Sequence, residues 1–213
     1  MNVTGTLDFL NASLNGDIKR FVQASSAAVC GESETLPVCE DVILKPVSPY
    51  AVSKIAAENY ARVFYSVYGL ETVCLRFFNV FGPRQAYNPY SGVITIFINE
   101  LMHNRPPSVF GDGEQTRDFV SVYDVVSCCM LALTKDSVGG EVFNVSSGKA
   151  TTVNNLVWLL QKIAGRSNLK PIYMNPRCGD IQHSWGNIDK ARKVMGYIPR
   201  VSLEKGLKEL LDY

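Results

Sequence analysis

The sequence predicts an α/β fold in which helices cover a parallel sheet. Three observations support this prediction. Apolar residues recur at helical spacing in several segments, near-continuous apolar runs typical of buried parallel strands lie between them, and glycine or proline separates one kind of segment from the other. With 213 residues, 46% of them hydrophobic, the chain is long enough to bury a core.

The N-terminal part of the chain alternates helix and strand. Apolar spacing predicts a helix over residues 3–14, which Asn15-Gly16-Asp17 ends. A longer helix is predicted from about Ser48 to Tyr68, and Gly69 ends it. The other predicted elements here are a short buried strand at 21–24, a proline-containing loop at 31–49, and a strand at 72–78 that is buried on both faces.

The alternation continues less regularly in the rest of the chain. Gly82-Pro83-Arg84 and the segment Asn88 to Gly92 mark a long loop, and Thr151 or Thr152 is expected to cap a helix that reaches Ala164. The other predicted helices cover 93–103, 124–134, 188–195 and 202–211, and the predicted strands cover 108–110, 118–122, 141–145 and 171–174.

Composition and charge exclude several classes of protein. Lysine and arginine number 21 against 20 aspartate and glutamate, so the net charge of +1 gives no footprint for nucleic acid. No apolar run approaches the ~20 residues that span a membrane, and the N-terminal segment does not read as a signal peptide, which favours a cytoplasmic location. The six cysteines lack CxxC spacing and there are only two histidines, so we expect reduced thiols and no metal site.

Tyr50 and Lys54 are the clearest candidates for chemistry. They lie at i and i+4 of the predicted helix, so both side chains share one face. An adjacent ammonium favours the phenolate and prepares the tyrosine for acid–base work, and a serine at the end of the preceding strand, Ser25 or Ser26, is placed to relay a proton. The same spacing also occurs on ordinary exposed helices, so spacing alone leaves both interpretations open.

Five sequence blocks, in order and spacing, resemble the extended short-chain dehydrogenase/reductase family. The blocks are ASSAAVCGE (24–32), SPYAVSK (48–54), LRFFNVFGPR (75–84), GDGEQTRDF (111–119) and RCGD (177–180). Within the family, they look most like the nucleotide-sugar 4-epimerases that act on UDP-glucose and UDP-N-acetylglucosamine. The resemblance covers essentially the whole chain.

This resemblance implies NAD-dependent 4-epimerisation of a UDP-hexose through a 4-keto intermediate, with NAD carrying the hydride. At the matching positions, Tyr50 is the acid–base, Lys54 holds the nicotinamide ribose and Ser26 relays the proton. The other positions carried over are Ser25, Phe77 and Phe78 beside the cofactor, and Asn79, Arg117, Arg177 and Asp180 around the diphosphate and ribose of the nucleotide sugar.

Three positions or segments bear on substrate and cofactor. Ser184 matches a family position where a small residue leaves room for a 2-acetamido group, so N-acetylated sugars are expected to fit. Cys30-Gly31 stands where the family usually has Tyr-Gly, which removes a phenol that often lines the sugar pocket.

The glycine-rich turn that binds the cofactor pyrophosphate is not found, and Met1 to Thr6 resembles the middle of the usual domain. We therefore expect a partial Rossmann-type parallel sheet, with its N-terminal half missing and one edge exposed.

The resemblance also implies a division into domains and an assembly. Residues 1–80 correspond to the C-terminal part of the NAD-binding Rossmann domain, and 81–213 mainly to a smaller α/β nucleotide-sugar domain, with about 118–145 returning to the first sheet. The helices at 3–14 and 48–68 resemble the pair that forms a four-helix bundle in family dimers, so a twofold homodimer is expected.

Two alternatives to the epimerase remain open. One is another nucleotide-sugar enzyme of the family, a dehydratase or decarboxylase. Ala27-Ala28 counts against a 4,6-dehydratase, in which an Asp-Glu pair is expected. The other is a non-catalytic nucleotide-sugar-binding fragment, favoured by the missing cofactor motif and opposed by the retained Ser26, Tyr50 and Lys54.

Overall fold

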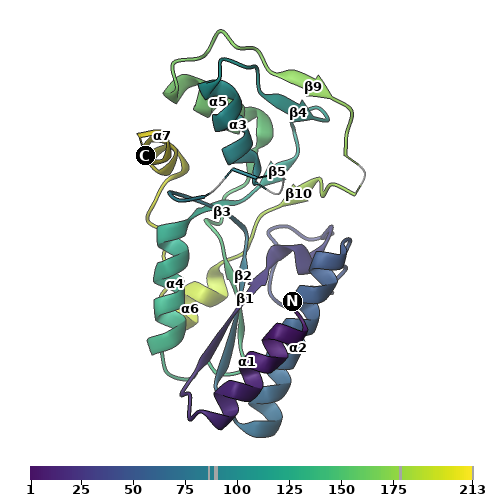
Figure 1. Ribbon diagram of the computed structural model, residues 1–213, viewed down its shortest axis with the longest axis vertical. Helices are drawn as coiled ribbons and strands as arrows, with labels where there is room; N and C mark the ends of the chain where they lie inside the picture. Colours follow the sequence, from purple (N-terminus) through teal and green to yellow (C-terminus); the bar gives the residue numbers. More distant parts are fainter. Residues whose placement is uncertain (86, 89–90, 178, 213) are drawn as a thin grey trace.

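The computed structural model describes residues 1–85, 87–88, 91–177 and 179–212. The predicted turn at Asn88 to Gly92 and the Cys178 thiol therefore fall partly or wholly outside the described residues. The chain forms a lower part built on a parallel sheet and an upper part of helices joined by short strands (Figure 1).

The lower part is a three-stranded parallel sheet in the order β1-β2-β7. Its strands are β1 (Phe21–Ser26), β2 (Thr72–Phe77) and β7 (Val142–Val145). The helices α1 (Thr4–Asn15) and α2 (Pro49–Tyr68) lie on one side, and α4 (Val122–Thr134) and α6 (Asp189–Met195) on the other (Figure 1). The α/β layering and the near-complete burial of β2 confirm the predicted fold class.

Local sequence signals fix both ends of α2. Ser48 Oγ accepts a hydrogen bond from Ala51 N, and Pro49 occupies the first turn, where its missing N–H costs nothing. Gly69 ends the helix in the left-handed conformation at φ 71°, which a residue without a side chain adopts most easily. These signals confirm the predicted boundaries of 48 and 68 to within one residue.

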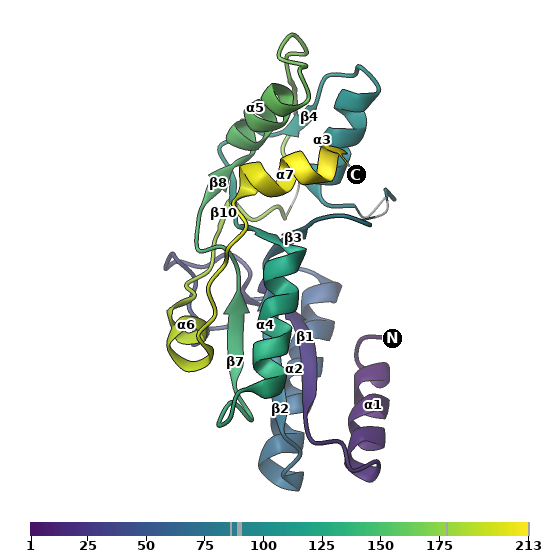
Figure 2. The ribbon, with the colours of Figure 1, turned by 90° about the vertical axis from the view of Figure 1, so that its left-hand side faces the viewer.

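The upper part packs three helices around a second apolar core, which contains Phe97, Leu156 and Leu207. The helices are α3 (Val93–Met102), α5 (Val153–Ile163) and α7 (Leu203–Asp212). Short strands form three small sheets. One pairs β3 (Asn79–Phe81) with β6 (Phe119–Ser121), and another pairs β4 (Ser108–Phe110) with β9 (Ile172–Met174). In the third, β5 (Thr116–Arg117) lies between β10 (His183–Ser184) and β8 (Thr151–Thr152). Figure 2 shows α7 crossing in front of this upper part.

Some short elements differ from the sequence prediction. The strand predicted over 72–78 ends at Phe77, because Asn79–Phe81 pairs with β6 instead of continuing beside β7. The segment 118–145 is thus divided between the two parts. Its strand β7 belongs to the lower sheet and its helix α4 packs on that sheet, whereas β6 pairs with β3. The sequence did not indicate the 3-10 helix η1 (Ala27–Cys30) or the two-residue strands, since such short segments have no measurable periodicity.

The two edges of the lower sheet are finished differently. At the β7 edge, Asn144 N donates to Glu40 Oε1 at 2.9 Å, and Lys190 Nζ donates to Val142 O at 2.8 Å. β1 is the opposite edge strand, and Lys54 Nζ reaches its Ala24 carbonyl at 2.8 Å. Side chains therefore cap the β7 edge, while β1 is the outer strand on the other side of this sheet.

Among the cysteines that the structure describes, Cys30, Cys39, Cys74, Cys128 and Cys129 are free. Within the described ranges, no group of three His, Cys, Asp or Glu side chains is arranged to hold a metal ion. In the same part of the chain, no helix combines the length and apolar character needed to cross a membrane.

Candidate active site

Most of the predicted site residues surround one cavity of about 300 Å³, just above the C-terminal ends of β1 and β2. The lining includes Ser26, Ser48, Phe77, Phe78, Asn79, Arg117, Asp180 and Ser184. These residues are far apart in the sequence and come from β1, β2, β3, β5, β10 and the loops beside them. The fold therefore brings together at one point the blocks that the resemblance singled out.

Ser26 is held by the turn that it begins. It is the last residue of β1 and caps η1, where its Oγ accepts a hydrogen bond from Ala28 N at 3.2 Å. Because a hydroxyl can both accept and donate, the Ser26 O–H can still donate into the cavity. This arrangement suits a group that passes a proton.

Tyr50 and Lys54 lie on the first turns of α2, beside the cavity and outside its lining. Lys54 Nζ is 5.8 Å from the centre of the Tyr50 ring and donates to Ala24 O, two residues before Ser26. Burial lowers the pKa of Lys54, while Tyr50 is 50% exposed. The predicted pairing of the two side chains is present, but no hydrogen bond joins the Tyr50 and Ser26 hydroxyls, both of which the structure describes.

Ser25 and Cys30 turn away from the cavity. Ser25 is 3% exposed, and its hydroxyl donates to Glu58 Oε2 at 2.8 Å. Cys30 packs with Val29, Val38 and Phe78 in a small apolar cluster, where burial raises the pKa of its thiol. The Cys30 side chain is thus part of this cluster and not of the cavity lining.

Asn79 is fixed by Asp118, a residue that the sequence analysis did not single out. The Asn79 backbone N and its Nδ2 both donate to Asp118 O, at 2.9 and 3.2 Å. The buried Asp118 carboxylate accepts from Ser147 N (2.7 Å), Ser147 Oγ (2.6 Å), Gly148 N (3.0 Å) and Gly186 N (3.3 Å). The signal in the sequence was a carboxylate directly before the apolar strand at 119–121.

Arg117 and Asp180 form an ion pair in the lining of the cavity. Arg117 Nη2 and Asp180 Oδ1 are 2.6 Å apart, and Arg117 Nη1 also donates to Thr116 O at 2.9 Å. Arg117 pairs with Ser184 in the parallel contact of β5 with β10, which explains why the two line the same cavity. The cavity therefore has a guanidinium and a carboxylate on one side and a small hydroxyl beside them.

Arg177 lies in two adjoining cavities of about 350 and 420 Å³. Its guanidinium carbon stacks 3.8 Å from the centre of the Phe110 ring, which uses the flat face of the group. The N–H donors of a guanidinium lie in its plane, so stacking on Phe110 leaves them directed sideways, where they can bind a planar anion. The 350 Å³ cavity is lined by both Arg117 and Arg177 together with apolar side chains of α3.

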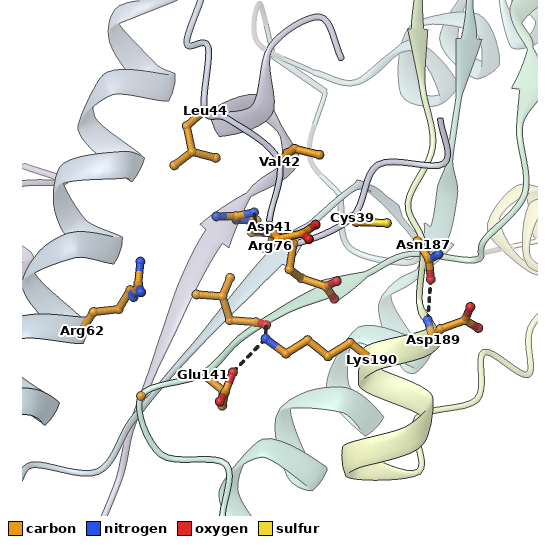
Figure 3. A pocket seen from close by; sticks show the side chains of 13 residues that line it. Cys39, Asp41, Val42, Leu44, Arg62, Arg76, Glu141, Asn187, Asp189 and Lys190 are labelled. Atoms are coloured by element: carbon orange, nitrogen blue, oxygen red, sulfur yellow. Dashed lines mark hydrogen bonds and ion pairs between the residues drawn. The ribbon is translucent and has the colours of Figure 1, made fainter. Parts of the chain in front are cut away.

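A larger pocket of about 600 Å³ lies away from these residues, between the β7 edge and the loop over 39–44. Figure 3 shows that its charged side chains include both signs and are partly paired. Lys190 Nζ is 2.8 Å from Glu141 Oε2 and also donates to Val142 O. None of the predicted site residues lines this pocket, so its size does not mark the candidate site.

Comparisons with known proteins agree with this arrangement. Residues 1–146 match the model of the NAD dependent epimerase/dehydratase family. A putative UDP-glucose 4-epimerase of Methanocaldococcus jannaschii is 38% identical over 100% of this chain and 68% of its own length. The UDP-glucose 4-epimerase of Thermotoga maritima, solved with UDP-glucose, has a TM-score of 0.95 and 39% identity over 100% of this chain and 68% of its own.

A further solved structure is UDP-N-acetylglucosamine 4-epimerase of Methanobrevibacter ruminantium M1, in complex with UDP-N-acetylmuramic acid. Its TM-score is 0.94 at 36% identity, over 99% of this chain and 67% of its own. The chain thus spans about two thirds of the length of the proteins it matches. From the family model and these likenesses together, this chain belongs to the NAD-dependent epimerase/dehydratase family.

Proposed function

We propose that this chain carries the nucleotide-sugar site and the acid–base residues of an NAD-dependent UDP-hexose 4-epimerase. The observation that carries the proposal is the convergence of Ser26, Asn79, Arg117, Asp180 and Ser184 on one cavity. Similarity to proteins named UDP-glucose 4-epimerase supports the same proposal. We further propose that the substrate is UDP-glucose or UDP-galactose, or the N-acetyl form of either.

The cavities suit the parts of a nucleotide sugar. Arg117 and Arg177, as permanently charged planar forks, suit the two phosphates of the diphosphate. The adjoining 350 Å³ cavity, with Phe97 and Phe110 in its lining, suits a flat base. Asp180 can accept hydrogen bonds from ribose hydroxyls once a phosphate takes its place beside Arg117.

The acid–base residues suit removal of the proton from the sugar O4. Tyr50 accepts this proton through Ser26, and the Lys54 ammonium stabilises the phenolate. NAD, when bound, supplies the hydride acceptor for C4 and returns the hydride. Lys54 Nζ gives one of its three donors to Ala24 O, so two remain for the hydroxyls of a nicotinamide ribose. The residues present fit this end of the cofactor.

Two measurements on the purified chain test the proposal. One assays NAD released on denaturation together with conversion of UDP-glucose and UDP-N-acetylglucosamine when NAD is added. The other measures UDP binding by calorimetry. UDP binding with turnover supports the epimerase. UDP binding without NAD or turnover favours the non-catalytic nucleotide-sugar-binding module. A chain that binds no UDP contradicts both.

Ser184 carries the proposed tolerance for N-acetylated sugars. Its small side chain lines the 300 Å³ cavity, next to Arg117 in the strand pairing. A Ser184→Tyr variant should weaken binding of UDP-N-acetylglucosamine by about tenfold or more and leave that of UDP-glucose nearly unchanged. Equal binding of both sugars by the variant would contradict this role.

The proposal includes a twofold homodimer formed through α1 and α2, and a cytoplasmic location. Exposed apolar side chains on these helices include Phe9 (69%), Val63 (48%) and Val67 (65%), which suit a helix-to-helix contact. Light scattering at micromolar concentration should give twice the monomer mass, and Val63→Lys should shift the mass toward the monomer. A monomer mass for the unchanged chain would refute this assembly.

A further inference from the structure

A buried ion pair lies directly behind the proposed reacting residues. Glu58 follows Lys54 by one helical turn, so Tyr50, Lys54 and Glu58 lie along one side of α2. The Glu58 carboxylate binds the guanidinium of Arg76 on β2 twice, Oε1 to Nη2 at 2.6 Å and Oε2 to Nε at 3.1 Å. The two side chains are only 2% and 4% exposed.

This pair contacts the segments that carry the reacting residues. Ser25, the neighbour of Ser26 on β1, donates its hydroxyl to Glu58 Oε2 at 2.8 Å. Arg76 Nη1 donates to Glu40 O at 2.8 Å, in the loop that leads to Ser48 and the start of α2. Figure 3 shows Arg76 where it meets this loop. One ion pair therefore joins β1, β2, α2 and the loop before it.

Near the reacting residues, the apolar contact between α2 and the sheet is made mainly by small side chains. Apart from Glu58, the buried side chains of α2 are Ala51, Ala57 and Ala61, with Phe64 packed against Leu10 and Leu70 nearer the C-terminal end of the helix. Small side chains let the helix approach closely but leave little relief to prevent sliding. A slip of one residue moves a helix by about 1.5 Å, which is enough to separate reacting groups. Directional bonds are therefore well suited to set the position of α2: Ser25 donates to Glu58 near the reacting residues, and Thr72 Oγ1 donates to Ala61 O at 2.8 Å farther along the helix.

We propose that the Glu58–Arg76 pair is a positioning element that fixes α2 in register against β1 and so sets the geometry of Ser26, Tyr50 and Lys54. Because desolvation offsets most of the attraction between buried charges, such a pair adds little net stability, and defined geometry is the physical reason to keep one here. The proposal rests on the proposed function only in taking these three residues as the reacting set.

The test replaces both charges with apolar side chains of similar size, in Glu58→Leu/Arg76→Met. Urea unfolding, UDP affinity and the titration of ¹³C-labelled Lys54 are measured on the 213-residue chain, with the Lys54 signal assigned from Lys54→Arg. We expect an unchanged urea midpoint, UDP affinity within about twofold of the parent, and a Lys54 pKa that rises toward that of exposed lysines as α2 loses its register. Where turnover is measurable, kcat should fall about 10²-fold at unchanged KM.

A matched control removes an ion pair at the other end of the sheet. Arg20 and Glu71 lie 2.8 Å apart before β1 and β2, and Arg20→Met/Glu71→Leu should leave the Lys54 titration unchanged. Arg76→Lys keeps the positive charge but cannot form the two-bond contact with Glu58. It should therefore raise the pKa of Lys54 as well, and it provides a second test if the double variant does not fold.

Two results would overturn the positioning role. One is an unchanged Lys54 titration in both variants, with any measurable turnover within about threefold. The other is a fall in the urea midpoint large enough to account for the lost turnover, which would make the pair a stability element. Failure of the proposed function gives a different result. If the parent chain binds no UDP and shows no turnover, but the variants still raise the pKa of Lys54, the epimerase is refuted and the positioning role of the ion pair is supported.

Discussion

Asp118→Asn should destabilise the chain far more than its size suggests. The carboxylate is fully buried at the junction of the lower sheet and the upper part, and it accepts four hydrogen bonds. The Asn oxygen can still accept from Ser147, but its NH₂ group then faces the N–H groups of Gly148 and Gly186, at 3.0 and 3.3 Å in the parent chain. Two buried donors lose their acceptor and meet another donor.

The magnitude follows from these two contacts. A hydrogen bond to a charged group contributes about 1.5 to 3 kcal/mol, and a buried donor left unpaired costs about 1 to 3 kcal/mol. Since the contacts share one carboxylate and do not add fully, the free energy of unfolding should fall by about 3 kcal/mol. In a chain of this length, that corresponds to a Tm lower by about 6 to 12 °C.

The assay is urea unfolding followed by circular dichroism, with Asp180→Asn as the matched control. Asp180 has the same side chain but is 35% exposed and forms an ion pair with Arg117, so its loss should cost no more than about 1 kcal/mol. A free energy of unfolding for Asp118→Asn within about 0.5 kcal/mol of that of the parent, as for a neutral surface substitution, would refute the reasoning that this carboxylate joins the two parts.

Three further predictions concern the site and the thiols. Lys54→Met should lower any NAD-supported turnover by about 10²-fold or more without changing UDP affinity in calorimetry, because the ammonium acts on the phenol and not on the nucleotide. Arg177→Lys should weaken UDP binding about tenfold, measured in the same way, since an ammonium cannot form the planar two-bond contact. Burial raises the pKa of Cys74 and Cys128 to about 12, so at pH 8 both should react with iodoacetamide much more slowly than the partly exposed Cys39, as followed by mass spectrometry.

The longer elements were predictable because local chemistry marks their ends. Ser48, Pro49 and Gly69 define α2, and Thr152 caps α5 by accepting from Asn155 N, as its position in the sequence suggested. The break after β2 was not predictable, since the apolar run continues through Phe78 and only the pairing of Asn79–Phe81 with β6 shows where the chain leaves the sheet. Pairing over such distances leaves no trace in a local window.

The candidate site was predictable only as far as sequence motifs reach. The motifs supplied Ser26, Tyr50 and Lys54 by resemblance, but the supporting pair of Glu58 and Arg76 depends on which helix face meets which strand. The one local signal was a charged residue one turn after Lys54, between alanines that are themselves buried. For the same reason, the motif showed that Cys30 removes a phenol from this position, but only the fold shows that its side chain packs in an apolar cluster.

The two halves of the site are held by different kinds of contact, and this difference has consequences for how they respond to a ligand. Ser26 is the last residue of β1, and Lys54 donates to the neutral backbone carbonyl of Ala24 in the same strand, so neither residue is held in place by an ion pair that salt would screen. Arg117, on the two-residue strand β5, and Asp180, in the loop before β10, instead hold each other at 16% and 35% exposure, where an anion can compete for the guanidinium. Nucleotide affinity should therefore depend strongly on ionic strength, while the geometry of the acid–base residues should not. For the proposed epimerase, this combination would keep the reacting centre in place while a polar, exchangeable clamp allows the ligand to move.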